Sequence, residues 1–484
     1  MPPPRPQNKA AITNTYSGFA CVGGVGLAYG ALEPAFLHDV APVAVATRSS
    51  DQPNIQPVTG TPVDLLNAGR RAKRVLLLQG PVGPFFSELH TSLLASGCSV
   101  TRVVFNAGDK FFAGQPDCVH FSGTLVQWDS WLRFKLGSNS FDAIVLFGSS
   151  RPLHKVARYL AALFNVDVIS LEEGYLRSGF VSCELGGNNQ HSPLINWTAG
   201  SAASDTAASE LEPVKLKSSF MTMSMWGTAY YLSRDLLSDP IAEDLFHRPR
   251  ERVLSLSVGW CAHMARRAVS RVLEAPLKRK LHRNPGYIIV PLQVSHDSQI
   301  QKASRGWTGT KLIDACLTAL ARSHPQQTVV FKLHPLERGN RKIKRLIHQR
   351  ARALGLSRTQ FKILHTGRIG DLTAQSSGMI IINSTSAFSA LHHGVPLLVL
   401  GDAVFRHDAI VTVGENQSDI TDFFKTRRAK SPQKVAEFFN AVKAQSLIPG
   451  DFYVSAGRSV AIKNILRKLD DLPVARSVTG EIAT

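Results

Sequence analysis

The sequence predicts an α/β protein built from two facing Rossmann-like domains. Short runs of consecutive apolar residues, such as 75–78 and 379–382, are typical of strands that are buried on both faces of a parallel sheet. These runs alternate with helical stretches in two separate parts of the chain, as parallel strands require. The length of 484 residues also exceeds one ordinary core, so we expect two domains.

The charge of the chain predicts an anionic partner. Lys and Arg number 55 against 36 Asp and Glu, which gives a formal net charge of +19. Nucleic acid, an acidic membrane surface and a phosphorylated or carboxylated substrate would all suit this balance. The sequence has no zinc-finger spacing, no RNP-like aromatic motif and no long basic arm, so we expect no nucleic acid. A solvated basic surface without a special partner is the alternative.

The cysteines predict a reducing compartment. The six cysteines are scattered along the chain and form no CxxC pair and no cluster with histidine. This pattern disfavours a structural zinc site and a disulfide framework, and it suits the cytoplasm.

Changes in composition divide the chain into six predicted parts. They are an N-terminal tail (1–70), an N-terminal Rossmann-like domain (71–200), a variable helical insertion (201–285), a C-terminal Rossmann-like domain (286–425), C-terminal helices (426–470) and a second tail (471–484). The apolar stretch 18–32 is too short and too rich in glycine for a good transmembrane helix. We expect a disordered or loosely docked tail, with a signal peptide as the alternative.

The first domain is expected to bind a ligand where its strands end. The loop 79–86 (QGPVGPFF) follows a strand, and Gly80 and Gly83 would let a ligand approach the backbone. Arg151 and His154 begin a helix whose N-terminus is suited to an anion. An ordinary turn between strand and helix would explain the same glycines.

Two adjacent carboxylates follow another predicted strand of this domain. Residues 166–171 run directly into Glu172 and Glu173, and Arg177 is near enough in sequence to pair with one of them. Carboxylates at a strand end are costly to bury unless they are paired or take part in chemistry. A salt-bridged turn is the alternative.

The insertion contains a strongly basic helix. Residues 263–283 interleave apolar residues with Lys and Arg, against the single acid Glu274. Such a composition resembles that of a helix lying on a membrane surface. A solvated helix explains it equally well, and Pro276 is expected to kink the helix.

Two polar segments of the second domain are suited to an anion. Lys332 and His334 lie two residues apart at the end of a strand and so share one face, and Pro335 fixes the following turn. Three hydroxyls follow another buried strand and precede a helix: Ser384, Thr385 and Ser386. Hydroxyls and helix N–H groups together form a phosphate cradle, whereas a plain helix N-cap is the alternative.

A third polar segment follows the first strand of the second domain. Asp297 stands there among hydroxyls and amides, one of which is Gln293. A carboxylate in this place is suited to attack an anomeric carbon or to act as a base. A helix cap or turn cap is the alternative.

Several of these segments, taken in order, resemble the capsule polysaccharide biosynthesis family of the KpsS and KpsC type. The segments that carry the resemblance are QGPVGPFF, FNAGD, LFGSSRPLHKVA, EEGYLRSGFVSCELGGNN, PLQVSHDSQI, FKLHPLERG and INSTSAFSALHHGVP. They cover roughly residues 74–408, and their combination is far more specific than any one of them.

The resemblance implies a glycosyltransferase with the GT-B fold that needs no metal. The family contains retaining β-Kdo transferases, which use CMP-Kdo and build a Kdo linker on a lysophosphatidylglycerol lipid. An anionic lipid acceptor, a cytoplasmic place at the inner-membrane surface and contact with the capsule export complex are implied as well. A GT-B transferase for another sugar nucleotide, or a non-catalytic capsule assembly or export factor, is the alternative.

The resemblance also implies roles for the predicted site residues. Asp297 would be the nucleophile, and Glu173 or its neighbour Glu172 would be the acid/base toward the acceptor. The residues implied for the CMP phosphate or ribose, and for the Kdo carboxylate, are Lys332, His334, Pro335, Gln293, Ser384, Thr385 and Ser386. The acceptor side would include Gly80, Gly83, Arg151 and Arg177.

The chain departs from the family pattern at three places. Ser149 stands where an aspartate is usual, and Ser178 stands where a proline commonly follows the arginine. Ser386 and Ala387 replace a usual Val-Gly pair. These departures concern the sugar and the acceptor, and they leave the predicted fold unchanged.

Overall fold

The computed structural model describes residues 73–472 except for short gaps. The gaps are residues 115–116, 177–178, 201–210, 216–218, 238–244, 246–252, 295–302, 336 and 338–339. The predicted tail 1–70 and residues 473–484 of the second predicted tail therefore lie outside the described residues.

The first sheet has seven strands in the order β13-β6-β5-β4-β1-β2-β3. Their bounds are β1 (Arg74–Leu77), β2 (Ser99–Val104), β3 (Val119–His120), β4 (Ala143–Phe147), β5 (Asp167–Glu173), β6 (Phe180–Leu185) and β13 (Leu447–Pro449). Strands β1 to β5 pair in parallel, as the continuous apolar runs predict. Strands β6 and β13 extend the sheet in antiparallel fashion.

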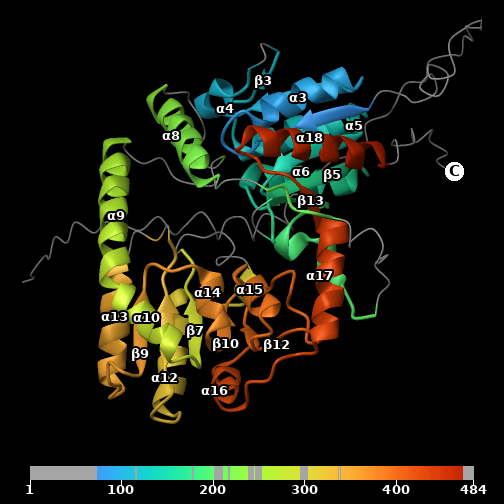
Figure 1. Cartoon of the computed structure of the whole chain (residues 1–484). Helices are drawn as coiled ribbons and strands as arrows, with labels where there is room; N and C mark the ends of the chain where they lie inside the picture. The colour runs from blue at the N-terminus through green and yellow to red at the C-terminus, as the bar shows by residue number, and fades with distance from the viewer. Residues whose placement is uncertain are drawn as a thin grey trace, which may run out of the picture. The chain divides into compact units, whose positions relative to one another are not determined.

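Helices cover both faces of the first sheet (Figure 1). The helices of this part are α3 (Phe85–Ala95), α4 (Ala107–Phe111), α5 (Leu125–Gly137), α6 (Pro152–Leu163), η1 (Asn189–His191), η2 (Pro193–Asn196), α8 (Phe220–Leu236) and α18 (Ser455–Asp470). Helices α3 and α18 share a core with alternate residues of β1, β4 and β5. Helices α5 and α6 pack against each other, and α8 packs on α4.

The second sheet has six parallel strands in the order β12-β11-β10-β7-β8-β9. The strands are β7 (Tyr287–Pro291), β8 (Val329–Lys332), β9 (Phe361–Leu364), β10 (Ser376–Ile381), β11 (Leu397–Val399) and β12 (Thr412–Val413). Alternate strand residues point into two different cores, so both faces of this sheet are buried. The α/β class with two Rossmann-like sheets is thus confirmed.

The helices that accompany the second sheet are α9 (Val253–Leu273), α10 (Ala275–Arg283), α12 (Gly309–Ala321), α13 (Asn340–Ala353), α14 (Ile369–Ala374), α15 (Ala387–His392), α16 (Gln417–Thr426) and α17 (Pro432–Ser446). The single helix predicted over 263–283 is divided into α9 and α10 at Glu274. Pro276 lies in the first turn of α10, where its missing N–H costs nothing.

The C-terminal segment returns to the first sheet. Strand β13 pairs with β6, and Arg458 of α18 forms a bidentate ion pair with Glu88 of α3 (2.7 and 2.8 Å). Phe452, between β13 and α18, is 1% exposed and meets Phe85 and Phe147 edge to face. The sequence predicted only helices in this region. The strand was missed because three residues ending in proline carry no alternation to recognise.

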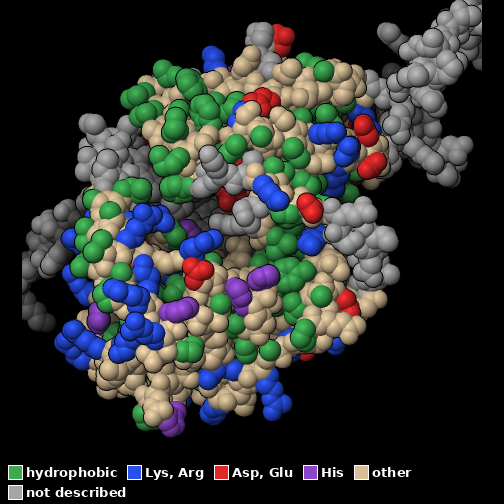
Figure 2. All heavy atoms as spheres, viewed as in Figure 1, with side chains coloured by type: hydrophobic (Ala, Val, Ile, Leu, Met, Phe, Trp, Pro, Cys, Tyr) green, Lys and Arg blue, Asp and Glu red, His purple; other side chains and the backbone are tan. Residues whose placement is uncertain are grey.

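The surface of the described residues is strongly basic in one region and contains no membrane-crossing helix. Within the described residues, no helix combines the length and the apolar character needed to cross a membrane. Figure 2 shows lysine and arginine side chains gathered over α10 and α13.

Replacing Phe452 by alanine is expected to destabilise the protein by about 3–5 kcal/mol, because the large cavity it leaves cannot collapse. The matched control is Phe134→Ala on α5, where the side chain is 71% exposed, so we expect a change within about 0.5 kcal/mol. Urea unfolding followed by tryptophan fluorescence measures both. Equal effects of the two substitutions would contradict the packing described here.

Candidate functional site

In each sheet, successive strands are first added on one side of a starting strand, and later strands are added on its other side. We call the place where this order changes the reversal point. In the first sheet, β1 leads to β2 on one side and β4 lies on its other side. In the second sheet, β7 leads to β8 on one side and β10 lies on its other side. Open α/β sheets bind ligands at the carboxyl ends of the strands that flank such a point.

Arg151 and Gly80 meet at the reversal point of the first sheet. Arg151 Nη1 donates to Gln79 Oε1 (2.7 Å) and to the carbonyl oxygen of Gly80 (3.3 Å). The guanidinium also lies over the ring of Phe147, 5.4 Å from its centroid. Two residues that the sequence placed on the acceptor side are therefore in contact.

Packing requires a glycine at position 80, and the backbone conformation requires one at position 83. A Cβ on Gly80 would lie 2.5 Å from the ring of Phe86. Gly83 has φ +108°, and a Cβ there would lie 3.0 Å from Trp226 of α8. These contacts support the simpler explanation of the two glycines, a strand-to-helix turn under close packing.

The buried carboxylate of Asp109, which the sequence did not single out, orients the side chains at the reversal point of the first sheet. Asp109 accepts hydrogen bonds from Phe105 N, Asn106 Nδ2 and Tyr230 Oη, each at 3.0 Å, and from Gln79 Nε2 at 3.1 Å. Burial raises the pKa of Asp109. Through Gln79 this network fixes Arg151. Asn106 and Asp109 have the spacing of a helix cap, which is only a weak signal of this network in the sequence.

Glu172 and Glu173 are the last two residues of β5, so these carboxylates lie at a strand end, as expected. They pair with Ser182 and Val181 of β6. Successive strand residues point to opposite faces, so the two carboxylates cannot act on the same face.

Glu172 and Arg151 both approach Gly148. A Cβ built on this glycine (φ +80°) would lie 3.3 Å from Arg151 Nε and 3.9 Å from Glu172 Oε2, so the two side chains are neighbours. Burial raises the pKa of Tyr453, and the charges of Glu173, Asp451 and Glu172 raise it further. Both glutamates therefore lie within electrostatic range of Tyr453, in the segment between β13 and α18.

His154 carries no positive charge at the reversal point of the first sheet. It is fully buried in α6, and its Nδ1 lies 2.8 Å from the carbonyl oxygen of Gly148. Burial lowers the pKa of His154 to about 3, so the ring is neutral at physiological pH.

The hydroxyl cluster lies at the reversal point of the second sheet. Gln293, after β7, donates through Nε2 to Asn383 Oδ1 after β10 (3.0 Å). The backbone continues from Asn383 into the half-buried Ser384, Thr385 and Ser386. Ser386 is the N-cap residue of α15 but its side chain makes no capping bond, and its hydroxyl donates to Ser384 Oγ (2.9 Å). Ser384 Oγ also accepts from the backbone N–H of Ser386 (3.3 Å), so Ser384 caps the turn that leads into α15, in line with the N-cap alternative.

Lys332 ends β8, one strand away from that point. Its buried ammonium donates to the carbonyl oxygens of Leu333 (2.8 Å) and His365 (3.0 Å), which occupy two of its three N–H groups. Burial lowers the pKa of Lys332 to about 8, although the nearby carboxylate of Glu274 opposes this shift. His334 is half-buried and Pro335 is exposed just beyond the strand.

Two predicted site residues, Asp297 and Arg177, lie outside the described residues. The sequence also missed Tyr175, which follows the glutamates. Its hydroxyl donates to Glu184 (2.8 Å), and its ring stacks on Phe388 of α15, with centroids 5.5 Å apart. Tyr175 lies in the EEGYL segment, but its packing on Phe388 could not be predicted, because Phe388 lies far along the chain.

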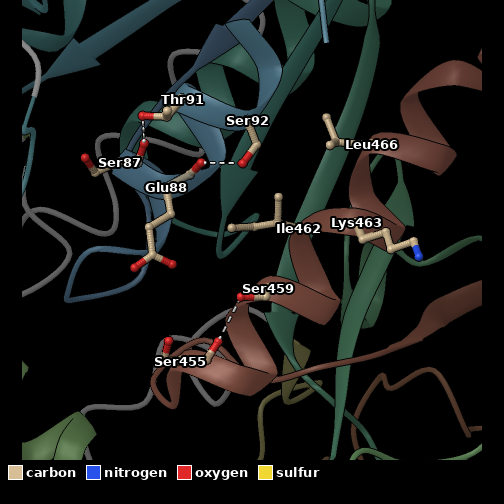
Figure 3. A pocket seen from close by; sticks show the side chains of 9 residues that line it. All are labelled: Ser87, Glu88, Thr91, Ser92, Ser455, Ser459, Ile462, Lys463 and Leu466. Atoms are coloured by element: carbon tan, nitrogen blue, oxygen red, sulfur yellow. Dashed lines mark hydrogen bonds between the residues drawn. The ribbon is translucent and has the colours of Figure 1, made fainter. Parts of the chain in front are cut away.

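A separate groove lies between α3 and α18 (Figure 3). It has a volume of about 580 Å³ and is lined by Ser87, Glu88, Thr91, Ser92, Ser455, Ser459, Ile462, Lys463 and Leu466. None of the predicted site residues lines it, so the reversal points remain the candidate site.

Comparison with known proteins identifies relatives of this chain. The sequence profile described as "Capsule polysaccharide biosynthesis protein" matches residues 142–453, which include both glutamates and the hydroxyl cluster. The capsule polysaccharide export protein KpsS of Escherichia coli is 30% identical over 340 residues, or 69% of this chain and 86% of that protein. The capsule polysaccharide modification protein LipB of Neisseria meningitidis serogroup A is 28% identical over 408 residues, or 81% of this chain and 94% of that protein.

Among solved structures, the chain is similar to the β-Kdo 2,7 transferase KpsC of Thermosulfurimonas dismutans. The two are 12% identical over 82% of this chain and 100% of that chain, with a TM-score of 0.37.

The free energy of unfolding is expected to depend on pH through Lys332. The unfolded lysine keeps its proton up to about pH 10.5, whereas the folded one releases it near pH 8, so stability rises with pH between these values. From about pH 7.5 to about pH 9.5, the wild type should gain about 2 kcal/mol relative to Lys332→Met.

Urea unfolding at several pH values measures this gain. Lys425→Met is the control, because that side chain is 65% exposed on α16, and its difference from the wild type should not vary with pH. The same flat difference for Lys332→Met would contradict the burial of this ammonium.

Proposed function

This chain belongs to the capsule polysaccharide biosynthesis protein family, and we propose that it is a retaining GT-B glycosyltransferase. The proposed reaction transfers Kdo from CMP-Kdo to a lysophosphatidylglycerol-type lipid acceptor. One observation carries the proposal: the Gln293–Asn383 hydrogen bond joins β7 to β10 and leads straight into the Ser384–Ser386 hydroxyls. A nucleotide sugar is a ligand of the kind that such a point binds.

The donor would lie against the second sheet. The hydroxyls of Ser384 and Thr385 and the backbone N–H groups around them suit the phosphate of CMP and the carboxylate of Kdo. His334, which follows the neighbouring strand β8, would contact the ribose or the phosphate. The Lys332 ammonium has one N–H left for an anion. Its other two N–H groups link the ends of β8 and β9 through the carbonyl oxygens of Leu333 and His365.

The chemistry would proceed through two inversions. The carboxylate of Asp297 attacks the anomeric carbon of Kdo, and the bond from that carbon to the CMP phosphate oxygen breaks. The acceptor hydroxyl then attacks the same carbon, releases the Asp297 carboxylate and gives its proton to a glutamate. Two inversions restore the original configuration, so the product is formed with retention.

Of the two glutamates, Glu172 is the better candidate for the base. It lies beside Arg151, which Gln79 fixes at the reversal point of the first sheet. Glu173, the next residue of the same strand, points to the opposite face. Arg151 would bind the anionic end of the acceptor, where a guanidinium matches a phosphate.

CMP is expected to stabilise the protein against thermal unfolding. A ligand at one hundred times its Kd raises the free energy of unfolding by about 2.7 kcal/mol. Ser384→Ala should weaken CMP binding about 10- to 100-fold, because a hydrogen bond to a charged group is lost. Ser130→Ala is the control, since that serine only bonds to its own helix α5. Differential scanning fluorimetry with CMP measures both. No shift with CMP, together with co-purification with export proteins, would favour the assembly-factor alternative.

Asp297→Asn is expected to lower Kdo transfer by at least about 10⁴-fold, because the nucleophile is lost. The CMP-induced stabilisation should persist. Glu172→Gln should lower transfer by about 10²- to 10⁴-fold, which is the range of general base catalysis, and Glu173→Gln should lower it less.

The measurement is incubation with CMP-Kdo and a fluorescent lysophosphatidylglycerol, with mass spectrometry for one added Kdo. Asp422→Asn, at a 68% exposed position on α16, is the control. Full activity of Asp297→Asn would refute the nucleophile, and a larger loss with Glu173→Gln would reverse the assignment of the base.

A further inference from the structure

The C-terminal half of α9 exposes an apolar face. Its exposed hydrophobic residues are Met264 (47%), Val269 (57%), Val272 (74%) and Leu273 (73%). At about 3.6 residues per turn, these side chains fall on one half of the helix together with Ala265 and Ala268. Soluble proteins seldom leave a contiguous apolar helix face in water unless it has a partner.

The other half of this segment of α9 is basic. Arg266 and Arg271 are exposed at the two margins of the apolar face. Arg267, in the middle of the opposite half, is partly buried, and its charge lowers the pKa of Lys332 in the second sheet. The apolar face is therefore directed away from that sheet.

Helix α10, which contacts α9, and helix α13 carry an unusual concentration of positive charge. Neither α10 nor α13 contains an Asp or a Glu. Their lysines and arginines are Lys278, Arg279, Lys280, Arg283, Arg341, Lys342, Lys344, Arg345, Arg350 and Arg352. Strand β9 connects the two sets, because Lys362 lies near Lys280 of α10 and beside Lys344 of α13. Figure 2 shows these charges next to the hydrophobic side chains along α9.

A small hollow lies within this basic surface. It has a volume of about 230 Å³, and its lining residues are Lys344, His348, Arg358, Phe361, Lys362 and Ile363. Burial lowers the pKa of His348, and the neighbouring charges of Arg358, Lys344 and Arg352 lower it further. Cations that converge on a hollow with no acidic lining residue repel one another, and a bound anion relieves that repulsion.

We propose that the apolar face of α9 and the basic surface of α10, α13 and β9 together dock the protein on a membrane leaflet that contains anionic phospholipid. The apolar side chains enter the boundary between headgroups and acyl chains, while the lysines and arginines bind headgroup phosphates. Charge alone would suit RNA as well, but RNA would leave the apolar half of α9 in water. This inference rests on the proposed function to the extent that a lipid acceptor is reached from a membrane surface.

Co-sedimentation of the full-length protein with vesicles tests the proposal. One set of vesicles contains phosphatidylglycerol and phosphatidylcholine in equal parts, and the other contains phosphatidylcholine alone. The apolar variant is Val269→Gln with Val272→Gln, which keeps good helix formers in α9. The basic variant is Arg279→Gln with Arg283→Gln. Phe134→Gln is the control, because Phe134 is equally exposed on α5.

We expect binding to the anionic vesicles and little binding to the neutral ones. The apolar variant should bind about tenfold more weakly or worse, because buried apolar area is lost. The basic variant should lose about fivefold per arginine at low salt and less at high salt. Phe134→Gln should bind like the wild type, and free glycerol phosphate should not displace the protein.

Three results would overturn the proposal: equal binding to both vesicle types, no effect of the apolar variant, or RNA binding that outcompetes vesicles. Kdo transfer to a soluble short-chain acceptor is measured separately, and the apolar variant should retain it. If no protein transfers Kdo but the vesicle results hold, the proposed reaction fails and the docking surface stands.

Discussion

Burial of the Glu184 carboxylate is the constraint on which much of this structure depends. The side chain is fully buried on β6, where a carboxylate is tolerated only if hydrogen-bond donors satisfy its oxygens. The donors are Tyr175 Oη (2.8 Å), Asn188 Nδ2 (2.9 Å), Ser446 Oγ (2.6 Å) and Ser192 Oγ. They come from the turn after β5, the η1–η2 segment and the end of α17. One acidic group thus holds together segments that are distant in sequence.

The same network connects the two reversal points. Tyr175 follows the glutamates of β5, and the bond to Glu184 fixes its hydroxyl. Its ring stacks on Phe388, which follows the Ser384–Ser386 cluster in α15. Protein interiors are close-packed, so a shift of either segment is transmitted to the other through this aromatic pair. The aromatic pair thus joins the segment that follows the hydroxyl cluster to the segment that follows the β5 carboxylates.

The sequence predicted the parts of the fold that local patterns encode, and it missed those that depend on distant partners. Apolar runs at 75–78 and 379–382 predicted buried parallel strands, which the structure contains. The edge strand β13 was missed because its partner, β6, is remote in sequence. Likewise Gln79, Asp109 and Tyr230 form one buried network although each is unremarkable in its own segment. The roles of Asp297, the glutamates and the hydroxyls remain predictions that come from the resemblance.

Positive charge is distributed unevenly between the reversal point of the second sheet and the exposed helices α10 and α13. A cation is expensive to bury, and the pKa of Lys332, lowered to about 8 beside the carboxylate of Glu274, reflects that cost. The reversal point of the second sheet instead presents neutral hydroxyls and amides, which can hold an anion without carrying a net charge. Exposed helices bear lysine and arginine without a desolvation penalty, and α10 and α13 carry such residues with no acid among them. One nucleotide sugar needs only a few contacts, so the net charge of +19 is in line with the proposed docking on an extended anionic surface.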